Sequence, residues 1–86
     1  MRNEGQCRAT REEIDEESRQ IRRLRIVVGL ALQMIAQGGM SFQDACDLAA
    51  ATRRVALQLF PGKESAYDLL YGPKFNRLIT SVYRLN

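Results

Sequence analysis

Residues 26–36 form the longest apolar run in the chain, and only Gln33 interrupts it with a strongly polar side chain. A helix that is apolar on nearly every side must be covered on nearly every side. This run is too short to cross a bilayer, because a membrane-spanning helix needs about 20 apolar residues. The run therefore predicts the central helix of a small bundle, with no membrane partner.

Glycine and proline divide the rest of the sequence into helical segments. Gly38 favours the end of a first helix, Pro61 breaks the chain after a second, and Gly72 with Pro73 separates a third from a fourth. No segment shows the apolar–polar alternation of a strand. We therefore expect an all-α fold, a small helical bundle of three to four helices with a long first helix. The expected helices are residues 12–37, 42–59, 63–71 and 73–84.

The length of 86 residues predicts a single domain. Residues 1–9 are polar and read as a flexible N-terminal tail, which leaves residues 10–86 as a single helical domain. Thr10 and Glu13 have the spacing of a capping box at the start of the first helix. A domain of this size buries only about 60 to 65% of its unfolded surface, so its stability margin is thin and self-association is a common remedy.

Composition excludes the commonest kinds of catalytic and metal site. The chain has no histidine and only two cysteines, Cys7 and Cys46, without CxxC spacing. Histidine is the usual general base and metal ligand, so we expect no cofactor, no metal and no enzymatic activity. Residues 1–17 are polar and lack the apolar segment of a signal peptide, and two scattered cysteines fit reduced thiols, so we expect a cytoplasmic protein.

The first helix carries large apolar residues at heptad spacing. Ile14, Ile21 and Val28 lie seven apart, with Leu24 between the last two. The helix is expected to be about 40 Å long and to extend past the shorter ones. We therefore predict that Ile14, Ile21, Leu24 and Val28 form an interface for self-association or for an unidentified protein partner. The alternative is that the last helix or the tail covers these residues, or that the helix end frays.

Two further faces are expected to cover the run at residues 26–36. The second helix has an alanine stripe, which we expect to pack against a row of small residues formed by Gly29 and Ala36. The fourth helix has one apolar face with i, i+3, i+4, i+7 spacing. That face consists of Phe75, Leu78, Ile79 and Val82.

A DNA-binding alternative rests on residues 41–60. Their spacing partly matches a helix-turn-helix motif, in which Thr52, Arg53 and Arg54 would contact DNA. The motif is degenerate, because Asp44 would occupy a buried position. Its turn, residues 49–51, would be three alanines, the best helix-forming residue. One continuous amphipathic helix explains the same residues and is the favoured interpretation.

The fourth helix also carries an exposed basic stripe that includes Lys74 and Arg77. If it lies beside the arginines of the first helix, the two form a basic patch that suits phosphates. The alternative is that these charges form solvated helix faces. The acids at residues 12–17 weaken the nucleic-acid interpretation, because they repel phosphates near one end.

Together these features predict a small non-enzymatic helical module for protein–protein interaction or regulation, homodimeric through its long first helix. The alternative function is a DNA-binding transcriptional regulator with a degenerate helix-turn-helix around residues 41–60.

Overall fold

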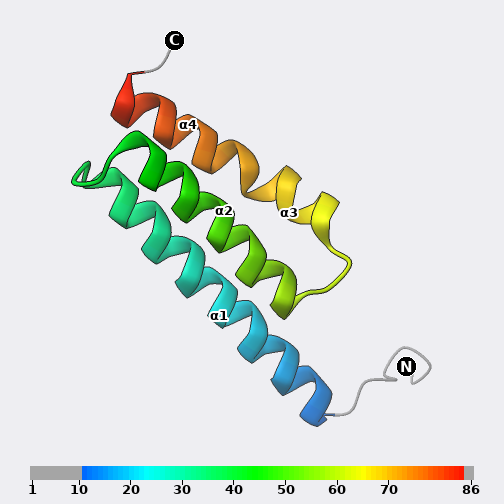
Figure 1. Ribbon diagram of the computed structural model, residues 1–86. Helices are drawn as coiled ribbons and strands as arrows, with labels where there is room; N and C mark the ends of the chain where they lie inside the picture. The colour runs from blue at the N-terminus through cyan, green and yellow to red at the C-terminus, as the bar shows by residue number, and fades with distance from the viewer. Residues whose placement is uncertain (1–10, 85–86) are drawn as a thin grey trace.

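The computed structural model describes residues 11–84, which form four helices (Figure 1). They are α1 (Arg11–Ala36), α2 (Phe42–Leu59), α3 (Glu64–Leu70) and α4 (Gly72–Tyr83). The predicted all-α bundle with a long first helix is confirmed. The expected tail at residues 1–9 and the cap at Thr10 lie outside the described residues.

Local sequence explains where the helices end. The side chain of Ser41 caps α2 by accepting a 3.0 Å hydrogen bond from the backbone N–H of Asp44. Gly38, after α1, has φ +72°, and Gly62, between α2 and α3, has φ +79°. Residues other than glycine rarely adopt this left-handed backbone conformation, so glycine at these positions allows the chain to turn.

Helices α1, α2 and α4 pack side by side, and each contacts the other two. Helix α3 is short and lies end to end with α4, so the two together line one side of α2 (Figure 1). Helices α1 and α2 run antiparallel, and the first turn of α2 therefore lies beside the last turn of α1 (Figure 1). The body is elongated, with extents of 53 × 20 × 20 Å.

The core sits around the second half of α1. Its fully covered centre is Ile35, which is 0% exposed, and Val28 and Ala31 extend the same stripe along α1. Facing this stripe are Ala45, Thr52 and Ala56 of α2, Tyr67 of α3, and Phe75 and Ile79 of α4. The predicted apolar face of α4 is confirmed, because Leu78 and Val82 are also partly buried.

The first half of α1 extends beyond this core, as predicted. No residue between positions 11 and 23 is buried, and the core begins with Leu24, which is partly buried against it. This half of α1 projects past the ends of the other helices (Figure 1).

Two details of the predicted packing are wrong. Gly29 and Ala36 do not face the alanines of α2; both are exposed, and a Cβ added at Gly29 would meet nothing within 4 Å. The buried stripe of α1 is shifted by one residue from the expected one. It is formed by Val28, Ala31 and Ile35. Nor is α1 covered on nearly every side, since among the described helices only α2 and α4 pack against it.

Two contacts join the end of α4 to the loop between α1 and α2. The Tyr83 hydroxyl donates a 2.6 Å hydrogen bond to the backbone oxygen of Met40. The Tyr83 ring also meets the Phe42 ring edge to face, with centroids 5.8 Å apart. These contacts close the end of the bundle opposite the projecting half of α1.

Candidate interaction surface

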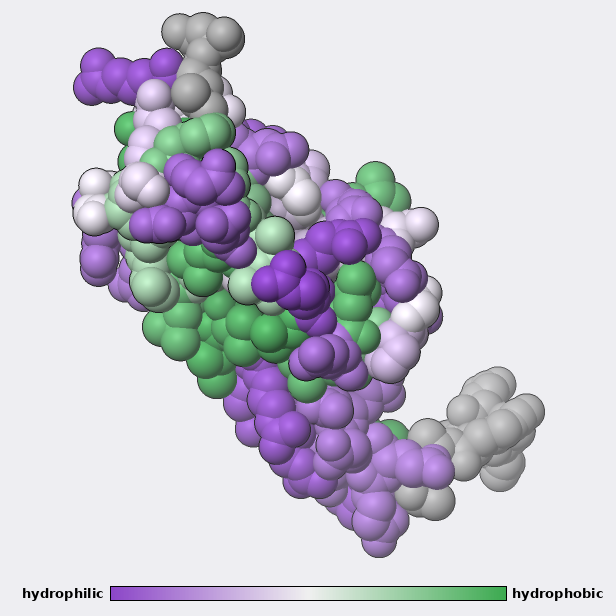
Figure 2. All heavy atoms as spheres, viewed as in Figure 1, coloured by the Kyte–Doolittle hydropathy of each residue, from purple (hydrophilic) through white to green (hydrophobic). Residues whose placement is uncertain are grey.

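Three large apolar side chains lie exposed along one face of α1. Ile26, Leu30 and Met34 are 54%, 55% and 48% exposed. Their i, i+4, i+8 spacing places them in one stripe, which we call the α1 apolar patch. Figure 2 shows apolar side chains gathered over the middle and second half of α1, next to the polar surface of its first half.

All three residues of the patch belong to the long apolar run at residues 26–36, but the sequence did not indicate that they would be exposed. The run has apolar residues on every side of the helix, so periodicity cannot distinguish the covered side from the open one. Only the placement of α2 and α4 decides which residues remain exposed.

The four residues predicted to form an interface do not share one environment. Ile14 is 53% exposed and Ile21 is 39% exposed, so both are accessible on the projecting half of α1. Leu24 is partly buried against the core. Val28 is only 3% exposed, and its assignment to an interface is wrong because it belongs to the chain's own core.

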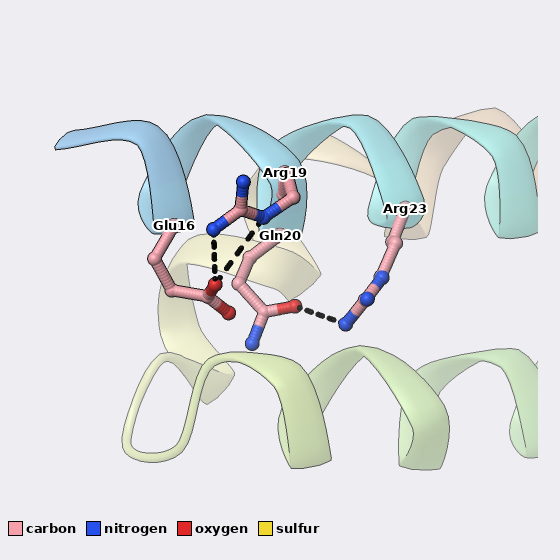
Figure 3. Close-up of polar contacts among 4 residues, drawn as sticks. All are labelled: Glu16, Arg19, Gln20 and Arg23. Atoms are coloured by element: carbon pink, nitrogen blue, oxygen red, sulfur yellow. Dashed lines mark hydrogen bonds and ion pairs between the residues drawn. The ribbon is translucent and has the colours of Figure 1, made fainter. Parts of the chain in front are cut away.

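The face of α1 that carries the patch is polar toward the N-terminus. Glu16 accepts two hydrogen bonds from Arg19, of 3.0 and 3.3 Å, and Gln20 accepts one of 3.2 Å from Arg23 (Figure 3). All four residues are within one or two turns of each other along α1. Glu16, Arg19 and Arg23 are exposed and Gln20 is half-buried. The ion pair between Glu16 and Arg19 contributes little to stability, because exposed ion pairs are worth about 0–1 kcal/mol. One face of α1 thus changes from charged to apolar along its length.

An apolar hollow of about 270 Å³ lies where the projecting half of α1 meets α2 and α3. Its lining includes Leu24, Leu57, Phe60, Tyr67 and Leu70. Burial raises the pKa of the Tyr67 hydroxyl, whose oxygen is enclosed without a hydrogen-bond partner among the described residues. The hollow offers apolar contact but no set of converging polar groups.

The structure contradicts the helix-turn-helix interpretation. Helix α2 is continuous from Phe42 to Leu59, so the turn expected at residues 49–51 is wrong; the alanines there extend the helix. Thr52 is 3% exposed, and its hydroxyl donates a 2.7 Å hydrogen bond to the backbone oxygen of Leu48. Thr52 is therefore unable to contact DNA.

The side chain of Arg53 is also bound to another residue of the chain. Its guanidinium donates hydrogen bonds of 2.8 and 3.1 Å to the two carboxylate oxygens of Asp68 on α3. This paired hydrogen bond holds the pKa of Asp68 below its usual value and raises the pKa of Arg53. The contact links α2 to α3, a role that sequence inspection missed because the partners are 15 positions apart.

The other basic candidates are exposed but scattered. Arg54 is exposed on α2, whereas Lys74 and Arg77 lie one turn apart on α4 and line a shallow groove between α4 and α1. Nucleic-acid contact by these three residues stays a prediction from the sequence.

Within residues 11–84, no group of three or more histidine, cysteine, aspartate or glutamate side chains is placed to hold a metal ion. None of the described helices is long and apolar enough to cross a membrane.

Comparisons with known proteins found no counterpart: no protein-family model, no curated protein and no solved structure matches this chain.

Proposed function

We propose that this protein is a small, non-enzymatic helical interaction module that self-associates through α1. The observation that carries the proposal is the α1 apolar patch, in which Ile26, Leu30 and Met34 each leave about half of a large side chain in water. Contiguous exposed apolar surface in a small folded domain is typical of a protein interaction site.

The shape of the chain supports the same function. Helix α1 has one face in the core and another open along much of its length, so it is able to serve both the chain's own bundle and a second one. Ile14 and Ile21 are also accessible, but their seven-residue spacing to Val28 places them on the core side of α1, so the patch supplies the apolar area for self-association. Burying such surface is worth about 25 cal/mol per Å², which favours association in a domain with a thin stability margin.

The proposed location is the cytoplasm, where thiols stay reduced. Cys46 is a free, half-buried thiol on α2, which is compatible with that environment.

Sedimentation analysis over a wide range of protein concentrations tests the proposal. The monomer mass is 9.8 kDa, and we expect the wild-type chain to approach twice that mass as concentration rises. Leu30→Glu places a charge in the centre of the patch and should leave the chain monomeric at every concentration. Asn76→Glu adds the same charge to an exposed position of α4 and should leave association unchanged. A wild-type chain that stays monomeric up to millimolar concentration would refute the proposal.

A further inference from the structure

The α1 apolar patch has opposite charges at its two ends. Toward the N-terminus it is followed by a group of arginines, of which Arg23 lies two turns before Leu30 and therefore on the same face. Arg23 has the amide oxygen of Gln20 as its hydrogen-bond partner, so its positive charge is not neutralised by a carboxylate there. The neighbouring arginines are Arg19, which is paired with Glu16, and Arg22 and Arg25.

The other end of the patch is negative. The last turn of α1 has no basic residue, but the partial negative charge of its carbonyl groups is opposed by the positive N-terminal end of α2 beside it, so the negative charge at this end comes from a side chain. The first turn of α2 lies beside it and contributes Asp44, whose side chain is exposed.

Asp44 lies on the flank of α2 that faces away from α3. Arg53 extends from one flank of α2 to reach Asp68 of α3. Val55, which is partly exposed, follows Arg53 by two positions, a rotation of roughly 200° around the helix, and therefore lies on the opposite flank. Asp44 is eleven positions before Val55, close to three full turns, so it shares that flank. The surface that a partner meets therefore runs from positive, through apolar, to negative.

We propose that the occupant of this surface is a second copy of the chain, paired antiparallel about a two-fold axis near Leu30. The inference rests on the proposed self-association and specifies its geometry. Two identical surfaces that are positive at one end and negative at the other complement each other only when one is reversed.

Helix geometry places the matching groups at the same level. A two-fold axis at position 30 sets Ile26 of one copy opposite Met34 of the other, and Leu30 opposite Leu30. It also sets Arg23 level with position 37, one residue past the end of the partner's α1 and beside the first turn of its α2. Each dimer then contains two contacts between Arg23 and Asp44. A parallel pair instead places Arg23 against Arg23 and Asp44 against Asp44, so like charges repel at both ends.

Cysteine cross-linking distinguishes the two orientations in the full chain. Cys7→Ala and Cys46→Ala remove the native thiols, and Ile26→Cys or Met34→Cys adds one on the patch. In the antiparallel dimer, position 26 of one copy is level with position 34 of the other. The two copies of position 26 are therefore about 12 Å apart along the helix axis, because eight residues at 1.5 Å separate positions 26 and 34. An equal mixture of the two variants should therefore cross-link through a short thiol reagent, whereas each alone should not. Leu30→Cys is the positive control, because two copies meet at the axis in either orientation.

Charge reversal tests the ends of the surface. Arg23→Glu or Asp44→Arg alone turns two attractions into two repulsions, so the dimer dissociation constant should rise on the order of tenfold at low salt, with a smaller effect at high salt. The double variant restores opposite charges and should recover most of the affinity. Arg77→Glu on α4 makes the same change in net charge as Arg23→Glu and should have no effect. In a parallel dimer each single reversal exchanges one pair of like charges for another, so the dissociation constant should change as little as it does for Arg77→Glu.

The outcomes separate the two proposals. Cross-linking of Ile26→Cys by itself, or single reversals without effect, overturns the antiparallel geometry while self-association stands. A monomeric wild-type chain overturns both. Cross-linking of the mixture only, together with recovery in the double variant, supports the antiparallel dimer.

Discussion

The clearest test of how α1 divides its two faces is a comparison of Ile35→Ala with Leu30→Ala. The two residues lie on one helix and lose aliphatic side chains of equal size, but Ile35 is 0% exposed and Leu30 is 55% exposed. We expect Ile35→Ala to lower the free energy of unfolding by about 2–5 kcal/mol, because it removes buried carbon and leaves a cavity. Full burial of a leucine is worth about 1.5–3 kcal/mol, so Leu30→Ala should lower it by about 1 kcal/mol in the isolated chain.

The difference is large against the total stability of such a small domain. At about 0.05–0.15 kcal/mol per residue, a chain of this length has roughly 4–13 kcal/mol. A loss of 1 kcal/mol shifts the melting temperature of a domain this small by about 4–8 °C. Ile35→Ala should therefore lower the melting temperature by about 8 °C or more, and Leu30→Ala by about 4–8 °C.

Urea unfolding followed by circular dichroism measures both variants at low and at high protein concentration. The effect of Ile35→Ala should be the same at both, whereas that of Leu30→Ala should grow with concentration, because association stabilises the folded state by mass action. A loss below 1 kcal/mol for Ile35→Ala would show that the core is not centred on this residue. Equal losses for both variants in dilute solution would show that Leu30 is as covered as Ile35.

Three further substitutions test single contacts. Tyr83→Phe removes the hydrogen bond to Met40 and should lower the free energy of unfolding by about 0.5–1.5 kcal/mol in chemical denaturation. Tyr67→Phe removes a buried hydroxyl without a partner among the described residues, so it should leave thermal stability unchanged or raise it. The pKa of Asp68 is lowered in the folded chain, so its pairing with Arg53 stabilises the fold above the ordinary aspartate pKa of about 3.9, and this stabilisation is lost as pH falls through the lowered value. Melting temperatures measured from pH 6 to pH 2 should therefore fall less steeply for Asp68→Asn than for the wild type, and parallel curves would contradict the role of the pair.

Local signals in the sequence determined the secondary structure. Gly38, Ser41, Gly62 and Pro73 act on the backbone of their immediate neighbours, so the expected helix ends differ from the observed ones by one residue for most helices. The apolar face of α4 was also predictable, because only one side of that helix is apolar. The projection of α1 followed from its length relative to the other helices.

Tertiary structure alone decided which sides of α1 and α2 are used. Val28, predicted to lie in an interface, is core, while Leu30, predicted to be covered, is exposed. Arg53, predicted to face DNA, is held by Asp68 from another helix. A helix that is apolar all round has no preferred inner side of its own, and a surface arginine has no preferred partner. Both are fixed only when the neighbouring helices come into place, and for α1 they leave Ile26, Leu30 and Met34 open to solvent.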